Sequence, residues 1–205
     1  MRVSASTFLL KNVGYTEMVT LARDTVFLFD ATQGEARARE DSTWIAKLFP
    51  GHHPVVVVVT DLAWPHVSGV RFWVARGATI IAHNAARPFL QSVVERRWTL
   101  APDALQKQPR PLRFVGVRDV GKLAGGEVLL FPIDGIGSEV ALAAYVGNSR
   151  FLWASDFVQS LSEPTAYVNE VVRAAHRVGI VPERVAAQHM ALVRWDTVSQ
   201  LGRSR

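Results

Sequence analysis

Five consecutive valines at residues 55–59 place the strongest constraint on the fold of this chain. An uninterrupted run of β-branched apolar residues is typical of a strand that is buried on both faces. The segment "ATIIAH" at 78–83 has the same character. Because such strands need helices on both sides of their sheets, the sequence predicts a layered structure of sheets and helices.

Strand-like and helix-like segments alternate along the rest of the chain. We expect helices at 34–49, 68–77, 86–98 and 163–179, and further strands at 6–13, 15–22, 25–31, 113–117, 127–133, 140–146, 150–156 and 184–190. Three prolines within 99–112 predict a surface excursion, and the residues after 190 read as a polar tail. The order gives two similar halves, so we predict an α/β (α+β) fold of two sheets sandwiched between helices, in a single domain over residues 1–205.

The composition excludes several classes of site and partner. The sequence has no cysteine, so any metal must be held by histidine and carboxylate side chains. Its net charge of +5 comes mostly from scattered arginines, which indicates a basic solvated surface and makes nucleic acid an unlikely partner. No apolar run approaches the roughly 18–20 residues of a membrane-spanning helix. No secretory signal is visible, and we expect a cytoplasmic protein.

The order of segments resembles the metallo-β-lactamase-fold hydrolases over nearly the whole chain. "VFLFDA" at 26–31 resembles an early strand of that family that ends in a structural aspartate, here Asp30. The stretch 48–89 resembles the region of the main metal motif, Thr-His-x-His-x-Asp-His. The stretch 135–157 resembles the region of a further histidine and a bridging aspartate, and "RVAAQHM" at 184–190 resembles the closing strand that supplies the last histidine. The resemblance implies a four-layer αββα sandwich.

The metal motif itself is largely replaced. In the family, two zinc ions share a bridging carboxylate and a bridging hydroxide, and they activate that water for hydrolysis. Asp61, Ala63 and Pro65 stand at the positions of the first two histidines and the aspartate of the motif, and only His66 is kept. Ser138 stands at the position of the mid-chain histidine.

The residues that match the family can supply ligands for at most one divalent ion. Asp156 matches the bridging carboxylate and His189 the last histidine, so the resemblance implies a ligand set of His66, Asp156 and His189, with Asp61 as a possible addition. Zinc is the first candidate for such a set, and iron and manganese are admissible.

Three functions stay open. In the first, the protein has a degraded dinuclear site, is non-catalytic or weakly active, and binds a small molecule or a protein in the former active-site cleft. In the second, a mononuclear metal-dependent hydrolase uses a metal-bound water on an ester, lactone or amide. A nucleic-acid-processing role ranks lowest, because the nucleases of this superfamily depend on the ligands that are missing here.

The candidate ligands also have structural interpretations. His66 can be a hydrogen-bonded structural histidine, Asp61 a loop carboxylate, and Trp64 a filler of the space left by the replaced ligands. The other histidines are expected to be structural (His83), solvated (His52 and His53) or at the surface (His176). Few residues precede the strand at 15–22, which predicts an open edge strand and, because exposed edges invite pairing, a homodimer.

Overall fold

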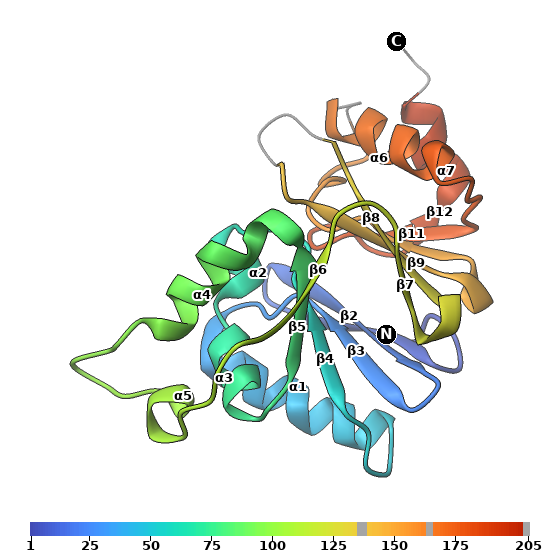
Figure 1. The fold of residues 1–205 in the computed structure, drawn as a ribbon. Coiled ribbons are helices and arrows are strands. Elements are labelled where there is room, and N and C mark those ends of the chain that lie inside the picture. The colour runs from blue at the N-terminus through green and yellow to red at the C-terminus, as the bar shows by residue number, and fades with distance from the viewer. Residues whose placement is uncertain (135–138, 163–165, 203–205) are drawn as a thin grey trace.

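The structure is a computed structural model that describes residues 1–134, 139–162 and 166–202. It contains two six-stranded mixed sheets, each with helices on its outer face (Figure 1). The first sheet has the order β1-β2-β3-β4-β5-β6, with β1 Thr7–Asn12, β2 Tyr15–Ala22, β3 Thr25–Phe29, β4 Val55–Val58, β5 Thr79–His83 and β6 Arg113–Val117. The second has the order β12-β11-β10-β9-β8-β7, with β7 Gly121–Leu123, β8 Val128–Pro132, β9 Leu142–Val146, β10 Phe151–Trp153, β11 Arg184–Ala186 and β12 Val193–Arg194. The predicted αββα sandwich is confirmed.

The helices form the two outer layers. The elements are α1 Gly34–Leu48, α2 Trp64–Val67, α3 Val70–Ala75, α4 Arg87–Glu95, α5 Ala104–Lys107, α6 Ala166–Arg177 and α7 Trp195–Leu201, with short 3-10 turns η1 Asn84–Ala86, η2 Ala124–Gly126 and η3 Gly147–Ser149. Helices α1 and α3 cover the first sheet, and α6 and α7 cover the second (Figure 1). None of the helices in the described part of the chain is both long and apolar enough to cross a bilayer.

The valine run contributes to two separate cores. Val57 and Val59 pack with α1 and α3 in the outer core, whereas Val58 packs in the core between the sheets. Successive side chains of a strand point to opposite faces of the sheet, so this strand needs apolar residues at every position. The prediction that the run is buried on both faces is therefore confirmed.

Two predictions about the elements are wrong. The helix expected at 68–77 begins earlier, at Trp64, and is divided into α2 and α3 at Gly69. The Gly69 amide donates to the Ala31 carbonyl at 2.7 Å, and a Cβ at this position would lie 3.1 Å from that oxygen, so the approach favours glycine. The expected polar tail after residue 190 instead forms β12 and α7, with Trp195 and Val198 buried in the outer core of the second sheet.

The topology directs several polar side chains to one edge of the sandwich. Strands β3, β4, β5 and β6 are parallel, so their carboxyl ends lie at the same edge of the first sheet. Strands β10 and β11 are parallel in the second sheet. Asp30 follows β3, Thr60 and Asp61 follow β4, Asp156 follows β10, and His189 follows β11. Ligand sites of α/β proteins commonly lie at such carboxyl ends.

Candidate functional site

Asp30 anchors the site at the end of β3. Its side chain is fully buried, and its backbone has a positive φ of 68°. Its Oδ1 accepts hydrogen bonds from the Thr60 amide and the Thr60 hydroxyl, each at 2.8 Å. The hydroxyls of Thr60 and Ser155 are 2.7 Å apart. Because the Thr60 proton is directed to Asp30, Ser155 is the donor in this contact, which joins the ends of β4 and β10.

His66 is the buried partner of Asp30. Its Nδ1 lies 3.1 Å from Asp30 Oδ2, and the imidazole is only 1% exposed. Burial is the largest single effect and acts to lower the pKa of this imidazole, whereas the adjacent Asp30 carboxylate acts to raise it. With smaller contributions from Asp61 and Asp156, the pKa of His66 lies above its ordinary value. The structure thus agrees with the interpretation of His66 as a structural histidine, here paired with Asp30.

His189 and Asp156 form a second pair, more open than the first. The His189 Nδ1–H donates to the Gly14 carbonyl at 2.7 Å, which directs Nε2 toward Asp156 Oδ1 at 3.3 Å. The other Asp156 oxygen accepts from Gln159 Nε2 at 3.2 Å. Burial raises the pKa of Asp156 above its ordinary value, and the positive charges of the neighbouring histidines offset this effect only in part. The Tyr15 ring packs against the imidazole, with 5.0 Å between ring centroids.

Asp61 is held by its own loop. Its Oδ1 accepts a hydrogen bond from the Ala63 amide at 2.7 Å, which is the geometry of an Asx turn. The Asp61 charge nevertheless acts on both His66 and Asp156, raising the pKa of each. Asp61 therefore contributes negative charge to the site while serving as a loop carboxylate.

The structure brings the predicted ligands into one neighbourhood without forming a metal-binding group. Asp61, His66 and Asp156 interact electrostatically, and His189 is in direct contact with Asp156. Among the residues that the structure describes, no three His, Cys, Asp or Glu side chains are arranged to hold a metal ion. Ser138 lies outside the described residues. The metal-binding role of these side chains stays a prediction.

The tryptophan beside the motif does not behave as expected. Trp64 is 59% exposed, so the prediction that it fills the space left by the replaced ligands is wrong. As the first residue of α2, it precedes Pro65, which sets the direction of the first turn. The other predicted structural and surface histidines behave as expected: His83 Nδ1 accepts from the Ala85 amide at 3.4 Å, and His176 is exposed.

Two site residues escaped the sequence analysis. Thr60 and Ser155 are both fully buried and connect Asp30 to the second sheet. Their positions in the sequence could have indicated them. Each is the polar residue directly before an aspartate at the end of an apolar strand, in "VVTD" and "WASD". Polar residues in that position become buried when both strands end at the same edge.

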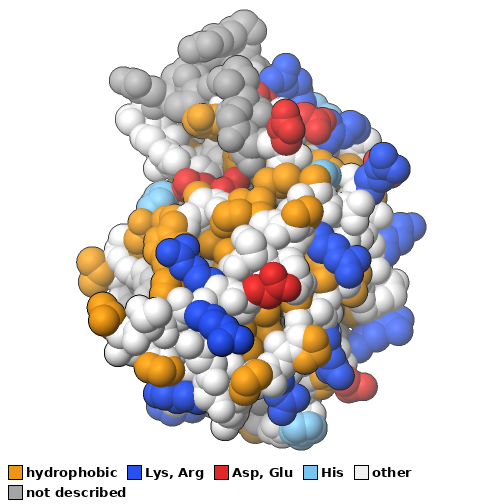
Figure 2. All heavy atoms as spheres, turned by 60° about the vertical axis from the view of Figure 1, so that its left-hand side comes forward, with side chains coloured by type: hydrophobic (Ala, Val, Ile, Leu, Met, Phe, Trp, Pro, Cys, Tyr) orange, Lys and Arg blue, Asp and Glu red, His pale blue; other side chains and the backbone are white. Residues whose placement is uncertain are grey.

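The basic side chains are not gathered into a surface for nucleic acid on the face that Figure 2 shows. Lys and Arg side chains are spread singly across this face and are separated by apolar and neutral surface. Nucleic-acid-binding surfaces generally collect such side chains into a patch or stripe. This distribution agrees with the scattering of arginines along the sequence.

Fold and site together define a class: an αββα sandwich in which the carboxyl ends of strands from both sheets present histidines and carboxylates at one edge. Solved metallo-β-lactamases share this fold. The DIM-1 metallo-β-lactamase superposes with a TM-score of 0.76 over 98% of this chain and 93% of its own, at 14% identity. A metallo-β-lactamase from Pontibacter korlensis superposes with a TM-score of 0.71 over 100% of this chain and 98% of its own, also at 14% identity.

The fold is shared beyond the lactamases. The chemotaxis sensor ODP, whose structure is described as a peroxy diiron species, superposes with a TM-score of 0.68 at 15% identity, over 98% of this chain and 93% of its own. No protein-family model matches the sequence, and no curated protein matches it. The similarity therefore establishes the metallo-β-lactamase fold.

Proposed function

We propose that this chain is a divergent metallo-β-lactamase-fold protein that has lost the two-metal centre and binds a small molecule in the former active-site cleft, with weak or no catalytic activity. The observation that supports the proposal is that each of the histidines and carboxylates kept at this edge already contacts another group of the protein. His66 contacts Asp30, His189 contacts both the Gly14 carbonyl and Asp156, and Asp61 accepts from its own loop.

The donor set does not fit a pair of metal ions. A dinuclear centre of the family type needs several imidazole and carboxylate ligands around each ion. Ala63 and Pro65 carry no side-chain donor atom at two of the motif positions. Asp61, at a third position, turns an oxygen toward the Ala63 amide. No reaction step through two metals is therefore assigned to this chain.

The charge of the cleft favours a ligand with a cationic or hydrogen-bond-donating group. Asp61 and Asp156 repel each other, which contributes to the raised pKa of Asp156. Three carboxylates, those of Asp30, Asp61 and Asp156, lie near the two imidazoles of His66 and His189, so acidic side chains outnumber basic ones among these residues. The exposed indole of Trp64 lies on the helix that carries His66 and offers an apolar face to a ligand.

One observation favours the alternative, a one-metal hydrolase that acts on an ester, lactone or amide. Both histidines are held through Nδ1, His66 by a carboxylate and His189 by a carbonyl. Metal-binding histidines are commonly held in this way, with the other ring nitrogen left for the ion. Against it, no three side chains in the described part of the chain are arranged as ligands, so the residues as placed do not fit an ion.

Ligand-observed NMR with small fragments tests the proposed binding. We expect benzylamine to bind and phenylacetate not to bind at this site, and Asp156→Asn to weaken benzylamine at least fivefold, since a lost charged contact is worth about 1.5–3 kcal/mol. Asp24→Asn is the matched control, because Asp24 is an exposed residue in the β2–β3 turn, at the amino end of β3. Equal weakening of benzylamine by both variants, or no binding of benzylamine, would contradict the proposal.

A further inference from the structure

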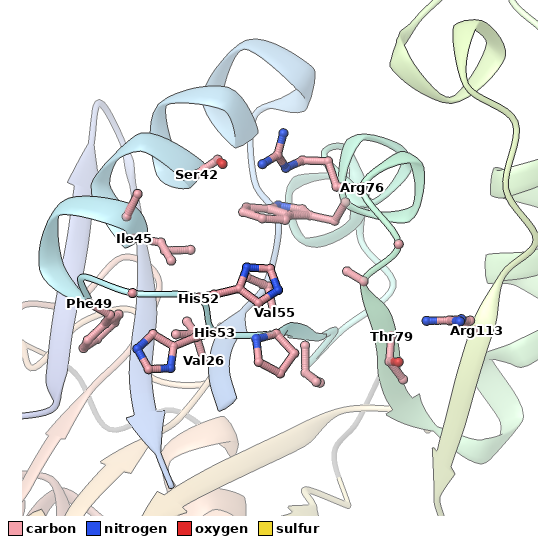
Figure 3. A pocket seen from close by; sticks show the side chains of 17 residues that line it. Val26, Ser42, Ile45, Phe49, His52, His53, Val55, Arg76, Thr79 and Arg113 are labelled. Atoms are coloured by element: carbon pink, nitrogen blue, oxygen red, sulfur yellow. The ribbon is translucent and has the colours of Figure 1, made fainter. Parts of the chain in front are cut away.

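A cavity lies at the opposite end of the first sheet from the candidate functional site. It has a volume of about 460 Å³ and is lined by the first residues of the parallel strands, among them Val26, Val55 and Thr79. The cleft residues follow the last residues of the same strands. Pockets of roughly 300–1,000 Å³ accommodate small organic ligands, so this cavity is large enough for one. Figure 3 shows the side chains that surround it.

The cavity is basic. His52, His53, Arg76 and Arg113 line it, and no Asp or Glu is among its described lining residues. Within the described part of the chain, neither Arg76 nor Arg113 takes part in an ion pair. Arg76 lies over the Phe72 ring, 5.6 Å from its centroid, which leaves its N–H donors free for an acceptor. Two guanidinium groups without a carboxylate can bind an anion.

A buried donor without a partner lies in the same wall. Trp73 lines the cavity and is 1% exposed, yet its indole Nε1 has no hydrogen-bond partner. Buried N–H groups are nearly always paired in folded proteins, and an unpaired one calls for an explanation. The remainder of the wall, including Ile45, Phe49 and Val55, is apolar.

We propose that this cavity binds a small organic anion, with its carboxylate or phosphate group at the basic part of the wall that includes Arg113 and its apolar part against Ile45, Phe49 and Val55. The basic side chains come from three separate segments: the loop between α1 and β4, the end of α3, and β6 (Figure 3). This site is separate from the cleft and does not depend on the function proposed for it.

The positions of the basic residues also have a structural interpretation. Arg76 is the C-cap of α3, and a cation at a helix C-terminus is stabilised by the helix dipole. That effect accounts for Arg76 alone. Arg113 lies on β6, at the edge of the first sheet, and its charge stabilises no helix end. Arg113 is therefore the residue on which the test depends.

Isothermal titration calorimetry with phenyl phosphate and phenylacetate tests the proposal, with inorganic phosphate and benzylamine as reference compounds. We expect at least one of the two organic anions to bind in the micromolar to low millimolar range and inorganic phosphate to bind at least fivefold more weakly. Benzylamine is expected to bind only in the cleft, so its affinity should be unchanged in Arg113→Gln. Whichever organic anion binds more tightly identifies the head group. Arg113→Gln should weaken the bound anion at least fivefold.

The control variant is Arg118→Gln, which removes the same charge from an exposed residue that does not line the cavity. We expect it to change the affinity less than twofold. Three results would overturn the proposal: no binding of either organic anion, equal loss in both variants, or inorganic phosphate binding as tightly as phenyl phosphate. Since Arg113 and Arg118 are both exposed to solvent, circular dichroism should show that both variants keep the fold.

Discussion

His66 Nδ1 lies 3.1 Å from Asp30 Oδ2, and both side chains are almost completely buried. This pair connects the loop after β4 to the end of β3, next to the hydroxyls of Thr60 and Ser155. The only motif histidine that the sequence keeps is therefore part of a buried polar network that stabilises the edge of the sandwich.

Asp30→Asn should destabilise the protein by about 3 kcal/mol, because breaking a buried ion pair leaves the remaining group without compensation. The amide keeps one oxygen for the Thr60 N–H but loses the charge that faces His66. Urea unfolding at pH 6 measures the change in the free energy of unfolding. Asp24→Asn, at an exposed turn, should change it by less than about 0.5 kcal/mol. Similar effects of the two substitutions would show that the His66–Asp30 pair does not stabilise the fold.

The His66–Asp30 pair should make the free energy of unfolding depend on pH, and the pKa shift of His66 gives the sign of that dependence. The pKa of His66 is raised in the folded state, so its stabilising contribution is complete below the unfolded value of about 6.5 and is lost as the pH rises through the folded value. In Asp30→Asn this loss should disappear. The free energy of unfolding, measured between pH 5 and 9, should fall with rising pH in the wild type and be flatter in the variant.

A second buried cluster, formed by Glu17 with Arg37 and Asp41 of α1, should also make the protein less stable as the pH rises, but for a different reason. Burial raises the pKa of Glu17 well above its ordinary value, the charge of Asp41 adds to the rise, and Arg37 offsets only part of it. The folded state therefore holds this proton more tightly than the unfolded chain does, and stability falls as the pH rises above the ordinary value of 4.5. Glu17→Gln should remove part of that fall, because the amide cannot ionise. Glu95→Gln, at an exposed position of α4, should leave the pH profile nearly unchanged.

The C-terminal helix is a structural part of the second half. Trp195→Ala should cost about 3–5 kcal/mol, since it removes a large side chain that is 5% exposed in the outer core. Trp64→Ala should cost less than about 1 kcal/mol, since that indole is mostly exposed. Thermal unfolding should therefore show a much larger decrease in melting temperature for Trp195→Ala than for Trp64→Ala. Equal melting temperatures would show that α7 does not stabilise the domain.

The elements predicted best were those in which consecutive residues of the sequence carry the signal, such as an uninterrupted apolar run. The valine run could be assigned to a doubly buried strand because every position is apolar, and α1 could be placed because Pro50 and Gly51 follow it. Helix α7 was missed because its core contacts come from two side chains, Trp195 and Val198, within a polar segment. Burial of that kind is set by the neighbouring α6 and β11 and is not visible in local periodicity.

The sequence predicted where the candidate site lies, but it did not predict which residues contact one another within the site. The apolar strands that end in aspartate indicated where Asp30 and Asp156 would lie, and the structure places both at the expected edge. The partners of these residues could not be predicted. The Gly14 carbonyl binds His189 across 175 positions of sequence, and Thr60 meets Ser155 across 95.

Restoring the motif should restore metal binding. A variant with Asp61→His, Ala63→His and Pro65→Asp supplies imidazole and carboxylate donors beside His66, and we expect it to bind at least one zinc ion per chain in a competition titration. The matched control carries Asp61→Gln, Ala63→Gln and Pro65→Asn, which changes the same positions without giving strong zinc ligands. If the restored variant stays folded and binds no more zinc than the control, the proposal that residues 61, 63 and 65 prevent metal binding is contradicted.

The metal content of the wild-type protein tests the central claim most directly. Protein produced with zinc, iron and manganese in the medium and purified without chelator should contain essentially none of these metals by mass spectrometry of the elements. One ion per chain that is lost in His189→Ala would replace the proposed binding function by the one-metal hydrolase. Two ions per chain, bound side by side in the cleft, would contradict the account.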